Sequence, residues 1–287
     1  MAYSALSRQL VVLSYQYRNI KDSLGLTEQI TTIGIVMLRL ITALSFTSLL
    51  ISTNSLATEI TLTASDNFAL KADYYPSKSN VQTANNRAVL MLHQCNYNRT
   101  MYDNIGEQLA QQSIHALSLD FRGFGESISS DFNVSNIRKL PQEERRNAWS
   151  NMSSHWPEDV QVAFDYLKEK VGENGKVGII GASCGGSQAI TLAEKESISA
   201  ISFFSSSQRD ENIARYGKTL IETPTLIIAS EDDGRTYTSA QQLFATAKHP
   251  DSKMISYKGN MHGYPLLDSD AALEETIVTW FDSELEK

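Results

Sequence analysis

The chain has 287 residues, of which 41% are hydrophobic, and its 25 basic and 33 acidic side chains give a formal net charge of −8. These values are ordinary for a globular protein of one large domain or two small ones. The acidic balance does not favour binding to nucleic acid or to anionic membranes, so neither is expected as a partner.

The first 57 residues have the composition of an export signal. Met37-Leu38-Arg39 is a short basic start, residues 40–51 are mostly apolar, and a polar stretch ends in Ser55-Leu56-Ala57. This layout predicts a secretory signal peptide that begins at Met37, is cleaved after Ala57 and leaves residues 1–36 as an upstream extension. We therefore expect an exported protein, periplasmic or secreted. An uncleaved membrane anchor is the alternative, but the apolar run is short for a bilayer span.

Residues 58–287 are expected to form one domain, because strand-like and helix-like segments alternate along them without a linker. The patterns predict strands at 59–63, 68–75, 87–93, 114–121, 176–181, 198–204, 225–229 and 253–257, and helices at 100–112, 158–171, 185–194, 238–247 and 271–285. This order predicts an α/β fold, in which a mostly parallel sheet has helices on both faces and the first two strands form an antiparallel hairpin at one edge.

One stretch departs from this alternation. Residues 127–157 form a long insertion that holds Trp149, Met152 and Trp156. Insertions of this length usually have a function, for example as a flap or as one wall of a binding site. The alternative is that the tryptophan side chains form a small packing cluster, and both interpretations stay open at this point.

The strand predicted at 176–181 runs directly into Gly181-Ala182-Ser183-Cys184-Gly185, and a helix follows at once. This is the G-x-S-x-G pattern in a strand–turn–helix context, where the serine at the tip of a strained turn acts as a nucleophile. Small residues two positions away on either side let the strand and the helix approach closely. Ser183 is therefore the expected nucleophile. Cys184 is the alternative, because Ala182 and Gly186 would also suit a turn shifted by one residue.

A serine nucleophile needs a base and an acid that orients this base, and in this pattern they follow in the order acid, then histidine. The strand at 225–229 runs into Ser230-Glu231-Asp232-Asp233, and the strand at 253–257 runs into a loop where glycine follows His262. Of the five histidines, only His262 lies beyond this acidic turn on a loop after the last strand. We expect His262 as the base and Asp233 as the acid, with Asp232 as the second choice.

These motifs resemble those of the α/β-hydrolases, most closely the compact dienelactone-hydrolase-like branch. The resemblance rests on residues 120–127, 177–186, 230–233 and 259–263, and it extends over essentially all of residues 58–287. It implies that the acid stands at the last position of its turn, which is Asp233. Dienelactone hydrolases proper use cysteine where this chain has Ser183. Relatives often have His-Gly after the first parallel strand, where this chain has His93-Gln94.

The oxyanion formed during acyl transfer needs backbone N–H donors. One is expected from the residue after the nucleophile, Cys184, and the resemblance points to Cys95 or Gln94 for the other. The only two cysteines of the chain thus fall on the two segments expected to line the oxyanion hole. Because an exported protein enters an oxidising compartment, we expect a Cys95–Cys184 disulfide, with two free thiols as the alternative.

The sequence thus predicts a serine hydrolase that cleaves carboxylic esters of small molecules through an acyl-enzyme, without a metal or a cofactor. The short connection at 205–218 leaves no room for a large cap domain. A peptidase or amidase with the same three residues is one alternative. A non-catalytic binding protein is another, but such a protein usually lacks one of the three residues, and none is missing here.

Overall fold

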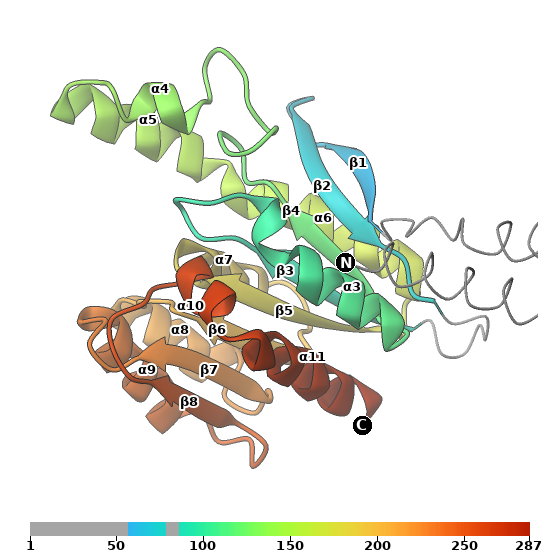
Figure 1. Ribbon diagram of the computed structural model, residues 1–287. Coiled ribbons are helices and arrows are strands. Elements are labelled where there is room, and N and C mark those ends of the chain that lie inside the picture. Colours follow the sequence, from blue (N-terminus) through green and yellow to red (C-terminus); the bar gives the residue numbers. More distant parts are fainter. Residues whose placement is uncertain (1–56, 79–85) are drawn as a thin grey trace, which may run out of the picture. The chain divides into compact units, whose positions relative to one another are not determined.

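The computed structural model describes residues 57–78 and 86–287, and eight strands in these ranges form one sheet (Figure 1). The strands are β1 (Thr58–Thr63), β2 (Ala69–Tyr75), β3 (Arg87–Leu92), β4 (His115–Leu119), β5 (Lys176–Ala182), β6 (Ala200–Phe204), β7 (Thr225–Ser230) and β8 (Lys253–Tyr257). Their order is β1-β2-β4-β3-β5-β6-β7-β8. The β1–β2 and β2–β4 pairs are antiparallel and all other neighbours are parallel. The expected sheet, with its hairpin at one edge, is confirmed.

Helices cover both faces of this sheet, as predicted (Figure 1). They are α3 (Asp103–Gln111), α4 (Val134–Ile137), α5 (Gln142–Ser154), α6 (Trp156–Val171), α7 (Cys184–Leu192), α8 (Asp210–Thr219), α9 (Arg235–Thr246), α10 (Tyr264–Ser269) and α11 (Ala271–Glu286), with a 3₁₀ turn, η2 (Arg99–Tyr102), before α3. Helices α6 to α9 pack into one core, and α3, α10 and α11 pack into a second. The pleat of β3 separates the two cores, since Leu90 belongs to the first and Val89 to the second.

Four helices, α4, α5, α8 and α10, were not predicted from the sequence. Helix α8 begins in the connection at 205–218, and its apolar face is short, with Tyr216 buried and Ile213 partly buried against the core. Helix α5 fully buries only Met152, while Ala148 and Trp149 pack partly against the core and its other residues are polar. Helix α10 has six residues and begins at Tyr264, where Pro265 suits a first turn. Residues 127–157 are therefore largely helical, with α4, α5 and the start of α6, and α5 extends away from the sheet (Figure 1).

The tryptophans of the insertion pack against the body of the domain. Trp156 is 3% exposed and stacks on Phe121, with ring centroids 5.2 Å apart. Trp149 meets Trp156 edge to face at 5.8 Å, and both rings contact Phe124. Met152 is fully buried in the same core. The packing interpretation of these side chains is thus confirmed, although the cluster is continuous with the main core rather than separate from it.

The predictions for the N-terminal region concern residues 1–56, which lie outside the described residues. The signal peptide, the start at Met37 and the cleavage after Ala57 therefore stay predictions. Within residues 57–78 and 86–287, none of the helices combines the length and the hydropathy that a bilayer crossing requires.

Candidate active site

Ser183 stands at a sharp turn between β5 and α7. The strand ends at Ala182, the helix begins at Cys184, and the serine between them has φ +49° and ψ −114°. A positive φ is unfavourable for a residue with a side chain, so the packing around the turn must hold it. A Cβ added to Gly181 would lie 2.5 Å from the backbone N of Gly186, which only glycine avoids. The sequence-predicted elbow is present with the serine at its tip.

The structure brings the three expected side chains together. Nε2 of His262 lies 3.0 Å from Oγ of Ser183, and Nδ1 of the same ring lies 2.6 Å from Oδ2 of Asp233. The imidazole side chain is 34% exposed and the carboxylate 18%, so the site opens to solvent at the histidine while its acid is covered. The donor N–H on Nδ1 fixes the tautomer in which Nε2 can accept a proton from the serine hydroxyl.

The two other acids of the turn after β7 face elsewhere. The carboxylate of Glu231 pairs with Lys258 at the surface. Asp232 contributes its backbone N–H, which donates to the carbonyl of Gly259 at 2.9 Å. This bond ties the acidic turn to the loop after β8. The geometry therefore favours Asp233 over Asp232, as the resemblance implied.

The two cysteines form a disulfide, with Cα atoms 5.8 Å apart. Cys184 is the first residue of α7, and Cys95 lies in the loop after β3, residues 93–98. The backbone N–H groups of both cysteines make no hydrogen bond within the described ranges. An oxyanion hole requires backbone N–H donors without another partner, and the disulfide joins the two segments expected to supply them. Gln94, the other candidate, is 1% exposed and directs its side chain to the loop after β8, where its Oε1 accepts from the N–H of Tyr264.

His93 has a structural part in this loop that the sequence did not reveal. Its Nδ1 donates to the carbonyl of Gln94 at 2.7 Å, and its Nε2 accepts from the N–H of Phe121 at 3.0 Å. Burial lowers the pKa of His93 to about 4, so the ring is neutral and can serve both bonds at once. The only sequence feature that could have indicated this structural role is the position of His93 at the end of the first predicted parallel strand. Its ring holds the loop that carries Cys95.

The remaining histidines lie elsewhere, as expected. His115 is buried in β4 beside Tyr74, His155 lies near Asp66, and His249 precedes Asp251. None of these rings contacts Ser183. His262 is therefore the histidine that the fold brings to Ser183.

Comparisons with known proteins agree with this architecture. A family model described as serine aminopeptidase, S33, matches residues 83–207. A dienelactone hydrolase from Anabaena variabilis has a similar structure, with 17% identity, a TM-score of 0.58, and coverage of 80% of this chain and 99% of its own. The chain has the α/β-hydrolase fold.

Other solved structures share this α/β-hydrolase fold. A thermostable carboxyl esterase from Bacillus coagulans is 12% identical with a TM-score of 0.58, and covers 80% of this chain and 99% of its own. An esterase from Exiguobacterium antarcticum is 14% identical with a TM-score of 0.54, and the similarity covers 78% of this chain and 99% of the esterase. No curated protein sequence matches the chain.

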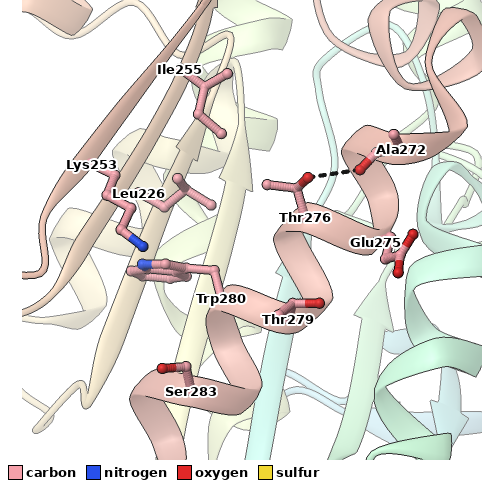
Figure 2. Close-up of a pocket in the computed structure, with 9 residues that line it drawn as sticks. All are labelled: Leu226, Lys253, Ile255, Ala272, Glu275, Thr276, Thr279, Trp280 and Ser283. Atoms are coloured by element: carbon pink, nitrogen blue, oxygen red, sulfur yellow. Dashed lines mark hydrogen bonds between the residues drawn. The ribbon is translucent and has the colours of Figure 1, made fainter.

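Two cavities differ in their relation to the site. One of about 350 Å³ adjoins the loop after β3 and is lined by Asn96, Tyr97, Asn98, Thr100, Phe124, Gly125, Val134 and Arg138. Arg138 of the insertion also donates to the carbonyl of Cys95 at 3.0 Å, so the insertion reaches the edge of the site. A second, of about 470 Å³, lies between α11 and strands β7 and β8, and none of the three active-site residues lines it (Figure 2).

Within residues 57–78 and 86–287, no group of three or more His, Cys, Asp or Glu side chains is placed to hold a metal ion. The site itself brings three reactive side chains together. These are one hydroxyl, one imidazole and one carboxylate in hydrogen-bonded sequence.

Proposed function

We propose that the protein is a serine hydrolase that cleaves carboxylic esters of small molecules through an acyl-enzyme intermediate. The observation that carries this proposal is the pair of hydrogen bonds that His262 makes, at 3.0 Å to Ser183 and at 2.6 Å to Asp233. The serine Oγ attacks the ester carbonyl while Nε2 of His262 takes its proton. Asp233 holds the ring in the reactive tautomer and stabilises the imidazolium that forms.

The second half of the cycle uses the same groups. His262 returns the proton to the leaving alcohol, then accepts one from a water that attacks the acyl-Ser183 carbonyl. In both halves the negative oxygen is stabilised by backbone N–H groups, for which Cys184 and Cys95 are the proposed donors, with Gln94 as the alternative to Cys95. Removing one such donor costs roughly 3–4 kcal/mol of transition-state stabilisation in other enzymes.

A second candidate function is the hydrolysis of peptides or amides. It is favoured by the match of residues 83–207 to the serine aminopeptidase model. Esters stay the first choice because the esterases and the dienelactone hydrolase noted above share the fold over most of their own lengths. A panel of short acyl esters, lactones and aminoacyl amides distinguishes the two functions by their kcat/KM.

Export also remains part of the proposal. The Cys95–Cys184 disulfide supports it, because such bonds form and persist in oxidising compartments. Sequencing the N-terminus of the protein recovered from outside the cytoplasm tests cleavage after Ala57. A mature protein that begins well before Ala57 contradicts it and favours the membrane-anchored alternative.

Labelling with a fluorophosphonate probe tests the proposed nucleophile. Wild type is expected to react, Ser183→Ala is expected to lose the label, and a variant with both Cys95→Ala and Cys184→Ala is expected to keep it at a reduced rate. Labelling that survives Ser183→Ala overturns the assignment. If the label survives in Ser183→Ala but is lost in the double alanine variant, a cysteine is the nucleophile, and Cys184 is the candidate.

A further inference from the structure

The side chain of Gln94 forms a buried bridge between two parts of the site. It is 1% exposed. Its Oε1 accepts from the backbone N–H of Tyr264 at 2.7 Å, and its Nε2 donates to Oδ1 of Asn96 at 2.5 Å. The second bond fixes the orientation of the amide, so that the oxygen faces the loop that carries His262.

The loop beside His262 is shaped around this amide. Gly263 has φ +66°, and a Cβ at this position would lie 1.7 Å from Oε1 of Gln94. A side chain there would therefore displace the amide as well as strain the backbone. The ring of Tyr264, one residue further on, stacks on Tyr97 of the β3 loop at 4.3 Å. Two residues of the β3 loop thus contact the two residues that follow His262.

The other restraints on this loop come from the opposite side. Oγ of Ser230, at the end of β7, donates to the carbonyl of Met261 at 2.6 Å, and Asp233 accepts from the His262 ring. Without Gln94, the stacking of Tyr97 on Tyr264 would still hold this loop from the side of β3. The amide of Gln94 supplies a hydrogen bond from the side on which the oxyanion donors lie.

A closed path of bonds results. Ser183 is joined through the peptide chain to Cys184, which is bonded to Cys95, the neighbour of Gln94. Gln94 is hydrogen-bonded to Tyr264, two residues from His262, and the imidazole returns to Oγ of Ser183. The positions of nucleophile, oxyanion donor and base are thus linked by a second route besides the sheet. Misplacing a catalytic group by about 1 Å can lower the rate 10²-fold, so we expect this second link to affect the rate.

We propose that Gln94 is a positioning residue, whose side-chain amide sets the placement of His262 relative to Ser183 and the oxyanion donors. This inference rests on the proposed function, in which His262 is the base. The side chain of Gln94 touches no reacting atom, because its amide is engaged by Tyr264 and Asn96. It acts through Tyr264 and Gly263, and this role needs a side chain where relatives often have glycine.

Kinetics of Gln94→Met and Gln94→Glu test this role. Methionine fills the volume but loses both bonds, and we expect kcat to fall about 10- to 100-fold with KM little changed. Glutamate keeps an acceptor for Tyr264 while Asn96 can turn its amide nitrogen toward it, so kcat should recover in part. Tyr216→Phe is the matched control, since it removes a buried hydrogen bond to Thr225 away from the site. It should lower stability and leave kcat unchanged.

A readout without substrate separates this inference from the proposed function. The proton on Nδ1 of His262, held by Asp233, should give a far-downfield ¹H NMR signal in wild type and Tyr216→Phe. In Gln94→Met the signal should broaden or vanish, because the loop is less restrained. A sharp, unshifted signal and an unchanged kcat in Gln94→Met overturn the inference. A wild type that shows the signal but hydrolyses no acyl substrate overturns the proposed function instead.

Discussion

Nε2 of His262 lies 3.0 Å from Oγ of Ser183, although the two residues are 79 positions apart in the chain. Their strands, β8 and β5, are not neighbours, because β6 and β7 lie between them in the sheet. The loop after β8 therefore has to bring its histidine back across two strand ends. Its anchors are on both sides: Ser230 at the end of β7 and Asp233 just after it on one side, and Gln94 after β3 on the other.

The adjacent acids of the β7 turn should differ sharply in their effect on rate. Asp233→Asn keeps the shape but offers the His262 ring an amide, which no longer enforces the reactive tautomer. We expect kcat to fall about 10⁴-fold, as it does when the triad acid is neutralised in a serine protease. Asp232→Asn is the matched control and should keep nearly all activity, because the contact that Asp232 makes with Gly259 uses its backbone N–H. A similar loss in both variants contradicts the assignment of Asp233.

Reducing the disulfide should lower activity before it unfolds the protein. The Cys95–Cys184 bond joins the two segments that carry the proposed oxyanion donors, and it spans a sequence separation of 89 residues. Loss of a native disulfide of this kind costs roughly 2–5 kcal/mol of unfolding free energy. Steady-state rates before and after treatment with a thiol reductant, next to a thermal melt, measure both effects.

The matched control for reduction is a variant with both Cys95→Ser and Cys184→Ser. Its rate should be low from the start and insensitive to the reductant. A reductant that slows this variant as much as wild type would show that the effect does not come from the disulfide. Equal rates for oxidised and reduced wild type, with the thiols confirmed by titration, would contradict the prediction.

The residues of the site that could be predicted from the sequence are those fixed by local backbone chemistry. Ser183 needs small neighbours at a strained turn, and Gly181 and Gly185 show that need in the sequence itself. Asp233 and His262 follow strands whose apolar runs are easy to recognise. In parallel sheets the strand ends gather at one edge, so chain order alone was enough to group these three residues.

The parts that could not be predicted depend on contacts between distant segments. The Gln94 amide meets Tyr264 across 170 positions, and the His93 ring meets the backbone of Phe121 across 28. Neither contact produces a periodic pattern in the sequence from which it could be predicted. Helix α8 was missed for a different reason, since its apolar face consists of only Tyr216 and Ile213 within a largely polar segment.

Arg122 should matter for stability rather than for catalysis. Its guanidinium is 1% exposed, and it makes two bonds to the fully buried carboxylate of Asp159 and two to Asp66. Arg122→Met leaves the Asp159 charge buried without its partner, which costs roughly 3–5 kcal/mol. Urea denaturation measures this loss, while kcat of the folded fraction should stay near that of wild type.

A second substitution checks the cause of that loss. Adding Asp159→Asn to Arg122→Met removes the unpaired charge and should recover a substantial part of the unfolding free energy. Equal stability of the single and double variants would mean that lost packing, such as the stacking of Arg122 on the Phe68 ring at 4.3 Å, outweighs the charge.

Stability should fall with acid in a way that depends on His93. Burial lowers the pKa of this ring to about 4 in the folded protein, whereas a free histidine titrates near 6.5. Between these values the unfolded chain binds a proton that the folded protein does not. The unfolding free energy therefore falls as pH drops from about 6.5 to about 4, by about 3 kcal/mol in total, and His93 adds no slope above pH 6.5.

Urea denaturation of wild type and His93→Gln at pH 7, 6, 5 and 4.5 measures this slope. Buried His115 has a lowered pKa as well and contributes with the same sign, so the difference between the two proteins is the informative quantity. The variant should be less stable at pH 7 but should lose less of its stability on acidification. If it does not fold, ¹H NMR titration of the His93 ring in wild type gives the answer directly. Parallel slopes, or a His93 ring that titrates near pH 6.5, would contradict a buried neutral imidazole that holds the loop of Cys95.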